Sequence, residues 1–405
     1  MRGALALLLL APLASADVRV VSPAGPYTQI QPAINAANDG DLVLVKPGTY
    51  VGFQVQAKAL AIVGDSLALV PVIGTVSVTD LAAGQTVSLI GLNVTGLAAA
   101  SASSHFGLYS NNNLGSLRCQ RCTFTGASPT LVPSNGFDGV RIENSSDVSL
   151  AGCTARGGDC TEASPSPYLM TVGGCGVRCL TSTLTFFDCA IEGGWGEEAI
   201  SYVSGSGGAG LQATDGTIFG SNSTIRGGQG GYGDFSPGPG YGGAGADVSG
   251  SMMRALGCTL VGGLDGDYEE TGQSGPAFVG GTYDFLPGTP RTLSVAPDRL
   301  RELHSLGLTF HGAPGEQVYL LVGLETAVQW DPLRLANYLI APPQYRTLLL
   351  GTTNASGDLI RSLPFGDLGG TTQSQVYFLQ PLFSGAGGAQ QLGTPVTLAV
   401  LDQAF

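Results

Sequence analysis

Apolar and polar positions alternate with period two through the middle of the chain, as in Val148-Ser149-Leu150 and Leu184-Thr185-Phe186. Glycine-rich turns separate these short segments. Successive side chains of a β-strand point to opposite faces, so this alternation is typical of strands and differs from the 3.6-residue period of a helix. The pattern therefore predicts a protein built largely from short strands.

Two short phrases recur in phase with each other at intervals of 29 to 37 residues. One places Asn93, Cys122, Cys153, Cys189, Ser223 and Cys258 at equivalent positions, and the other begins at Gly107, Gly139, Gly176, Gly210 and Gly245. Repeats of this length indicate a solenoid, in which each coil of two or three strands stacks about 4.8 Å from the next. The variable part of each repeat follows its glycine pair, so we expect all the long loops to project from one turn and form one surface. These loops are residues 127–138, 159–175, 194–209, 228–244 and 263–274.

The first section predicts a cap for this stack. Residues 29–37 carry apolar side chains at helical spacing, and Thr28 with Gln31 resembles a capping box. A helix here would cover the open end of the solenoid, where strand edges are otherwise exposed.

From about Thr289 the repeat stops, and some seven short apolar strands separated by turn signals predict a small antiparallel β-sandwich. We therefore expect an all-β protein with a right-handed parallel β-helix at residues 17–287 and a C-terminal β-sandwich at 288–405. No glycine-rich linker separates the two, so we expect the sandwich to pack on the last coil as a second cap.

Residues 1–16 read as a secretory signal peptide with cleavage before Asp17, because Arg2 precedes an apolar run and Ala14-Ser15-Ala16 supplies small residues. An N-terminal membrane anchor is the alternative. No later run of about 18 apolar residues follows, so we expect no membrane span. The chain is then secreted or held at the cell surface, as a monomer.

Composition limits the kinds of partner that the chain can bind. Acidic residues outnumber Lys and Arg by 30 to 17, which gives a formal charge of −13, and charged residues are only 12% of the chain. A phosphate backbone would be repelled, so we expect no nucleic-acid binding. Polysaccharides and divalent cations remain open.

The segments Tyr27–Ile34 and Gly40–Tyr50, with the later Cys-Thr-x-x-Gly-Gly phrases, resemble secreted bacterial parallel β-helix proteins of the pectin-lyase-like fold. The C-terminal section is similar to a domain common on secreted planctomycete-type proteins. The first resemblance implies a fold shared by lyases, hydrolases and non-catalytic surface proteins. The Asn-Thr-Asp, Asp-Asp, Gly-His-Gly and Arg-Ile-Lys phrases of polygalacturonases are missing, as are the Trp-Ile-Asp-His and Arg-x-Pro-x-x-Arg phrases of pectate lyases.

One strand face carries candidate chemistry. If Val140 and Ile142 point inward, an outward column contains Tyr109, Arg141, Arg178, Gln212 and Asp247. The resemblance implies a substrate groove over this face, with Arg141, Arg178, Asp138 and Glu143 as catalytic candidates. An arginine near carboxylates could abstract a proton beside a uronate, with Ca²⁺ neutralising the sugar acid. The alternative is a solvated column of ordinary ion pairs.

The long loops carry carboxylates and aromatic rings that could bind a ligand: Trp195, Glu197, Glu198, Tyr202, Tyr232, Tyr241, Asp265, Asp267, Tyr268 and Glu269. Aromatic rings stack on sugars. Two carboxylates could hydrolyse a glycosidic bond, and Asp265, Asp267, Glu269 and Glu270 could hold Ca²⁺. Solubility and loop packing are the alternative.

The cysteines at equivalent coil positions predict a buried stack of small side chains, with disulfides between neighbours as the alternative. Cys160 and Cys175 bracket one loop, and a disulfide between them would pin its base. The Cys119-x-x-Cys122 and Cys175-x-x-x-Cys179 spacings leave zinc as a further alternative, although we expect Cys119 and Cys179 to point inward.

Two functions remain, beside a purely structural spacer as a third option. The sequence favours a non-catalytic protein that binds polysaccharide or another surface through its loops. The alternative is a divergent polysaccharide lyase or glycoside hydrolase acting in a groove on the β-helix face.

Overall fold

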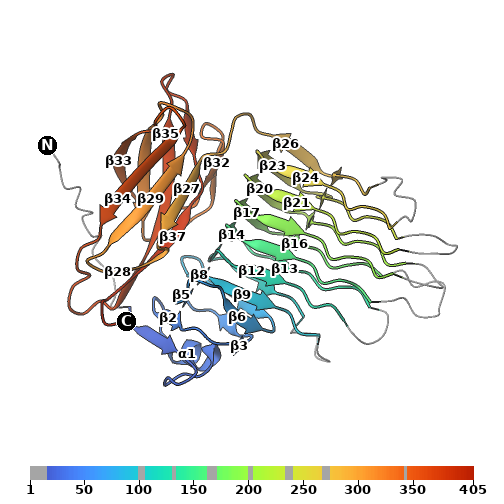
Figure 1. Ribbon diagram of the computed structural model, residues 1–405, viewed down its shortest axis with the longest axis horizontal. Helices are drawn as coiled ribbons and strands as arrows, with labels where there is room; N and C mark the ends of the chain where they lie inside the picture. The colour runs from blue at the N-terminus through green and yellow to red at the C-terminus, as the bar shows by residue number, and fades with distance from the viewer. Residues whose placement is uncertain are drawn as a thin grey trace.

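The computed structural model describes residues 16–98, 105–129, 134–161, 171–198, 204–232, 240–266, 274–341 and 344–405. A parallel β-helix fills one side of the molecule, and a β-sandwich lies against it (Figure 1). The predicted all-β architecture of solenoid and sandwich is confirmed. Among the described residues, no helix has the length and apolarity needed to cross a membrane.

Three parallel sheets run the length of the β-helix. Sheet A contains β1 (Val18–Val21), β2 (Leu42–Val45), β5 (Leu60–Gly64), β8 (Thr86–Ile90), β11 (Ser116–Gln120), β14 (Asp147–Ala151), β17 (Thr183–Phe187), β20 (Thr217–Ser221), β23 (Met252–Leu256) and β26 (Thr282–Phe285). Sheet B contains β3 (Tyr50–Val51), β6 (Val70–Ile73), β9 (Leu92–Thr95), β12 (Thr123–Thr125), β15 (Thr154–Arg156), β18 (Ala190–Glu192), β21 (Thr224–Arg226) and β24 (Thr259–Val261). Sheet C contains β4 (Gln54–Gln56), β7 (Val76–Thr79), β10 (Leu108–Asn111), β13 (Val140–Glu143), β16 (Val177–Leu180), β19 (Leu211–Thr214), β22 (Ala246–Asp247) and β25 (Phe278–Val279).

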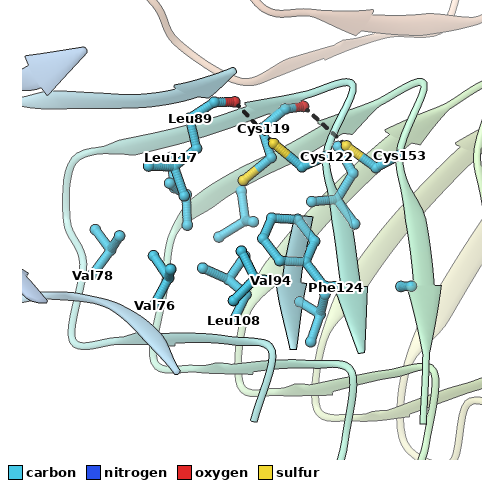
Figure 2. Packing of buried hydrophobic residues seen from close by; sticks show 14 of the residues in the cluster. Val76, Val78, Leu89, Val94, Leu108, Leu117, Cys119, Cys122, Phe124 and Cys153 are labelled. Carbon is cyan, nitrogen blue, oxygen red and sulfur yellow. Dashed lines mark hydrogen bonds between the residues drawn. The ribbon is translucent and has the colours of Figure 1, made fainter. Parts of the chain in front are cut away.

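The corner between sheets A and B follows one rule in successive coils. A residue with positive φ ends the sheet A strand, as at Arg121 (φ 49°) and Asp188 (φ 53°), and the cysteine or serine of the repeat comes next. The thiol then donates to two carbonyls: Cys122 Sγ lies 3.4 Å from both Leu89 O and Gln120 O. Figure 2 shows this thiol and that of Cys153 at the edge of the apolar core. The predicted stack is confirmed for Cys122, Cys153 and Cys189, which are buried; Cys258 at its end is only half-buried, and all eight cysteines are free.

The N-terminal end of the stack is closed by the helix α1 (Ile30–Ala36). The predicted capping box does not form, because Gln29 is the N-cap and makes no side-chain capping bond. Gln31 reaches the sheet edge instead, where its amide bonds to both the N–H and the carbonyl of Gln54 (2.7 and 3.1 Å). Gln29 accepts from Val51 N–H at 3.0 Å, so glutamine side chains satisfy the otherwise unpaired edges of the first coil.

The sandwich follows the last coil in the chain. One sheet has β27 (Thr292–Ala296), β29 (Ser305–His311) and β34 (Asp358–Pro364); the other has β28 (Arg299–Arg301), β37 (Val396–Leu401), β35 (Ser374–Ser384), β30 (Gln317–Gly323), β33 (Arg346–Thr352) and β36 (Gln390–Leu392). A separate hairpin pairs β31 (Gln329–Asp331) with β32 (Ala336–Tyr338). The apolar faces of the two sandwich sheets enclose a second core that includes Phe310, Phe383 and Leu398.

The prediction that the sandwich caps the last coil is wrong. It packs sideways along the outer face of sheet A (Figure 1). At early coils Ala399 and Leu401 share an apolar cluster with Leu42, and at later coils Leu339 clusters with Phe187. Both faces of sheet A are therefore buried, which explains the uninterrupted apolar run of β2.

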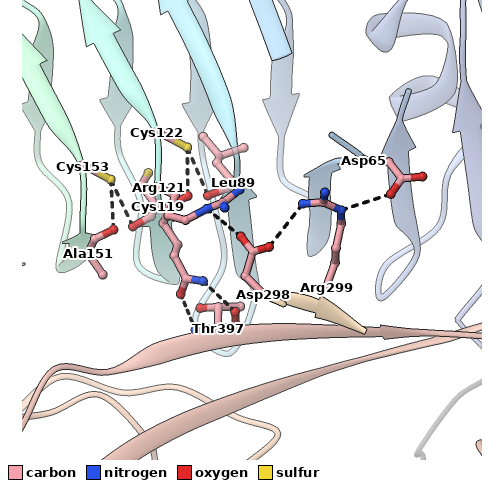
Figure 3. A network of polar contacts seen from close by, with 11 residues as sticks. Asp65, Leu89, Cys119, Arg121, Cys122, Ala151, Cys153, Asp298, Arg299 and Thr397 are labelled. Atoms are coloured by element: carbon pink, nitrogen blue, oxygen red, sulfur yellow. Dashed lines mark hydrogen bonds and ion pairs between the residues drawn. The ribbon is translucent and has the colours of Figure 1, made fainter. Parts of the chain in front are cut away.

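Polar contacts fix this interface. Gln120 donates to Thr397 O at 3.0 Å and accepts from Thr397 N–H at 2.6 Å. Figure 3 shows a chain of charges beside it, in which Arg121 and Arg299 both contact Asp298 (2.8 and 3.3 Å) and Arg299 also reaches Asp65 (3.1 Å).

Candidate functional site

The outward face of sheet C carries the predicted polar column. Backbone register aligns Tyr109 with Arg141, Arg141 with Arg178, Arg178 with Gln212, and Gln212 with Asp247. The inward neighbours Val140 and Ile142 are fully buried, so the period-two prediction is confirmed. The same register continues the column to Ser77 and Gln54, which the sequence reasoning missed because the early coils lack the repeat phrase.

The middle of the column is an ordered network. Arg141 Nε donates to Glu143 Oε1 at 2.7 Å, and the hydroxyl of Tyr109 donates to Glu143 Oε2 at 3.0 Å. Burial raises the pKa of Tyr109, and its hydrogen bond to Glu143 raises it further, so the phenol stays a donor at neutral pH. Glu143 thus holds both neighbours in fixed orientations.

Asp138 differs from the other candidates, because only 3% of it is exposed. Its Oδ1 accepts from Cys175 N–H at 3.0 Å, and its Oδ2 accepts from Arg178 Nε at 2.8 Å. Arg178 also donates to Gln212. The buried carboxylate of Asp138 therefore holds Arg178 in position within the column.

These contacts bear on proton transfer. Burial alone would lower the pKa of Arg178, but the neighbouring Cys175 thiol and Asp138 carboxylate raise it above the ordinary arginine value. Arg178 therefore holds its proton, and both oxygens of Asp138 are already occupied. The arrangement offers fixed donors and acceptors of the kind that bind hydroxyl groups.

A hollow of about 520 Å³ lies over the first part of the column. It is lined by Gln54, Ser77, Thr79, Phe106, Tyr109, Arg141 and Glu143. The rings of Phe106 and Tyr109 stack at 5.7 Å, and the guanidinium of Arg141 lies 5.2 Å from the Phe106 centroid. The sequence did not point to Phe106 as a site residue. The one feature that could have done so is its position directly before the repeated phrase that begins at Gly107.

The described parts of the long segments after each glycine pair are regular extended chains rather than irregular loops. Their described first and last residues run out and back as stacked extended chains (Figure 1), and backbone hydrogen bonds join outgoing to returning segments. Gly174 donates to Gly158 O, Gly194 to Gly174 O and Gly208 to Gly194 O, each at 2.8 Å. A Cβ on any of these glycines would overlap a backbone carbonyl of a neighbouring chain. We call these extended segments together the glycine slab. In the sequence they carry glycine at every third residue, such as Gly193/Gly196 and Gly205/Gly208. Three residues per turn is the period of extended polyproline II-type chains.

The slab separates the predicted loop residues. Trp195 and Tyr241 are 48% and 67% exposed, on outgoing and returning segments respectively. Glu197 and Glu198 follow Trp195 on the outgoing segment, where both are exposed, and Tyr232 lies on the next outgoing segment. Tyr202, Asp267, Tyr268, Glu269 and Glu270 lie outside the described residues.

The described part of the chain contains no group of three or more His, Cys, Asp or Glu side chains that could hold a metal ion. Asp265 forms a hydrogen bond within the slab, where its Oδ1 accepts from Gly242 N–H at 2.7 Å. The other residues of the predicted Ca²⁺ site lie outside the described ranges, so that site stays a prediction.

Cys160 and Cys175 are both buried free thiols, so the structure does not contain the bridge predicted between them. They have different partners: Cys160 Sγ accepts from Glu197 N–H at 3.3 Å, whereas Cys175 Sγ lies 3.2 Å from Arg178 Nη2. Burial raises the pKa of both thiols, to about 12 for Cys175.

A scan against protein-family models and a search of curated proteins found no match to this chain.

Proposed function

We propose that this protein is a secreted or cell-surface β-helix protein that binds a neutral polysaccharide, without cleaving it, along the outer face of sheet C. The observation that carries the proposal is the hollow over Phe106, Tyr109, Arg141 and Glu143, where stacked aromatic rings adjoin fixed polar groups. Clefts with apolar walls and a few placed polar groups are typical of ligand sites. The pectin-lyase-like resemblance and the planctomycete-type C-terminal domain belong to the same proposal.

Charge favours a neutral ligand. The column and the residues bonded to it carry two arginines, Arg141 and Arg178, against the carboxylates of Asp138, Glu143 and Asp247. The site therefore offers no excess positive charge to a polyuronate, and the whole chain carries a formal charge of −13.

The contacts also favour binding over catalysis. The two groups best placed for acid–base chemistry, Asp138 and Arg178, are bonded to each other. Glu143 is bonded to Tyr109 and Arg141, which leaves spare donor positions on the guanidinium for sugar hydroxyls.

The test measures both retention and cleavage. Full-length protein is incubated with insoluble cellulose, xylan, mannan and polygalacturonate, and bound protein and released reducing or unsaturated ends are quantified. We expect retention on a neutral polymer without product, and at least about tenfold weaker binding for Tyr109→Ala and Arg141→Ala, which corresponds to about 1.4 kcal/mol.

Thr214→Ala is the matched control, because Thr214 is exposed on β19 of the same sheet and outside the hollow. Release of product that Arg141→Ala abolishes would instead establish a lyase or hydrolase. Binding that none of the groove variants weakens would move the site away from sheet C.

A further inference from the structure

A second hollow lies on sheet B and the outgoing face of the glycine slab. It measures about 150 Å³ and is lined by Glu192, Trp195, Arg226, Gly227, Gln229, Val261, Gly262, Gly263 and Leu264. The residues come from three successive coils, whose strands β18, β21 and β24 are paired in register. It shares no residue with the hollow over sheet C.

The indole of Trp195 forms one wall of this hollow and is held in place. Its backbone N–H donates to Asp159 Oδ1 at 2.8 Å, and its carbonyl accepts from Cys160 N–H at 3.0 Å. The guanidinium of Arg156, from the preceding coil, lies 5.1 Å from the ring centroid. The other lining residues come from the same coil and the following two, so the ring stands between Arg156 and the hollow, with nearly half of its surface exposed.

Backbone and two apolar side chains, Val261 and Leu264, complete the walls. Gly227, Gly262 and Gly263 contribute no side chains, which leaves room for a ring-shaped ligand beside the indole. Leu264 is 53% exposed and Val261 is half-buried, so apolar groups besides the indole border the hollow.

The polar side chains that line this hollow are available to bond a ligand. Within the described part of the chain, Glu192, Arg226 and Gln229 make no side-chain hydrogen bond and no ion pair. Glu192 lies between Arg156 and Arg226 in the strand register, yet Arg156 pairs with Asp159 instead. The sheet C column differs, because there the arginines and carboxylates already bond to one another.

We infer that this hollow is a second carbohydrate subsite, which binds one pyranose ring of a neutral polysaccharide with equatorial hydroxyls on the indole of Trp195. The inference takes its ligand class from the proposed function, but it concerns a different face of the molecule. The flat C–H face of such a ring packs on the indole, and the outward hydroxyls meet the Glu192 carboxylate, the Arg226 guanidinium and the Gln229 amide.

Size and charge point to the same ligand. Pockets for whole drug-sized ligands measure about 300–1,000 Å³, so this hollow suits one ring of a chain that continues across the surface. Glu192 and Arg226 cancel in charge, which gives no preference for a charged sugar.

Tryptophan fluorescence tests the inference directly, because the chain has only two tryptophans. Trp330 lies in the interface, 5.7 Å from the Phe219 ring and 4.6 Å from the Arg254 guanidinium. A Trp330→Phe variant therefore reports from Trp195 alone. We expect cellohexaose to change its emission saturably, and mannohexaose, whose 2-hydroxyl is axial, to do so at least about fivefold more weakly.

Calorimetric titration with cellohexaose then separates the two sites. Trp195→Ala and Glu192→Ala should weaken the binding event by at least about tenfold, Trp195→Phe should weaken it less, and Arg141→Ala should leave the Trp195 emission change intact. Absence of any emission change with millimolar cellohexaose, or binding that only Arg141→Ala removes, would overturn the second subsite. Persistence of the emission change when no variant of the sheet C groove affects binding would instead support this subsite and refute the proposed groove.

Discussion

Arg118 and Asp147 show how a polar residue on an outward strand position can become part of the interior. Arg118 Nη1 donates to Asp147 Oδ1 at 2.6 Å, and Ser116 donates to the other oxygen at 2.6 Å. Both charged side chains are at most 7% exposed, because the sandwich covers this part of sheet A. Alternation alone places Arg118 on the outer face and leaves open what covers it.

We predict that Arg118→Met destabilises the protein by about 3–5 kcal/mol, since it leaves the Asp147 charge buried without its partner. The double variant Arg118→Met, Asp147→Leu should recover much of that loss, because no unpaired charge remains. Urea unfolding of both variants measures the difference. Equal destabilisation by the two would show that packing, rather than the unpaired charge, determines the effect.

At the scale of elements, the glycine slab is built by close approach rather than by unusual backbone angles. Its interior glycines do not have positive φ, and at positions such as Gly158, Gly174, Gly194 and Gly208 a neighbouring carbonyl occupies the space of a Cβ. The sequence predicts loops here, because glycine clusters normally mark turns. The period of three was present in the sequence, but only stacked coils give those glycines chains to pack against.

We predict that Gly194→Ala destabilises the protein by about 1–3 kcal/mol, because the added methyl group would overlap the Gly158 carbonyl. Hydrogen exchange should show faster opening of the slab amides, such as Gly208 N–H, with little change in the sandwich. Gly387→Ala is the control, since a Cβ there meets no atom within 4 Å. Similar losses for both variants would argue against close packing as the cause.

At the scale of the whole molecule, Asp65 links the β-helix to the sandwich. It accepts from Lys46 at 2.7 Å on the preceding coil and from Arg299 and Arg301 at 3.1 and 3.3 Å on β28. Burial alone would raise its pKa, but the hydrogen bond from Lys46 and the charges of Lys46, Arg301 and Arg299 lower the pKa below the ordinary aspartate value. The ionised form is therefore favoured in the folded protein.

Because the folded-state pKa of Asp65 is depressed, its stabilisation is present above the unfolded pKa, near 4, and is lost as pH falls through the folded pKa. We predict that Asp65→Asn lowers the free energy of unfolding by about 2 kcal/mol at pH 7. The difference from the parent should shrink as pH falls from about 5 to 2, as measured by urea unfolding across that range. A difference independent of pH would show that the ionised carboxylate does not stabilise the interface.

The sequence by itself determined the coil architecture, the inward stack of small thiols and the outward register of Tyr109, Arg141, Arg178, Gln212 and Asp247. These follow from period-two alternation and repeat phase, which act locally and recur in each coil. The tertiary structure alone decided that the sandwich covers sheet A, that Gln31 rather than a capping box closes the first coil, and that Trp195 borders a hollow with unpaired polar groups. Each depends on surfaces brought together from distant parts of the chain, and such contacts leave no fixed spacing in a sequence.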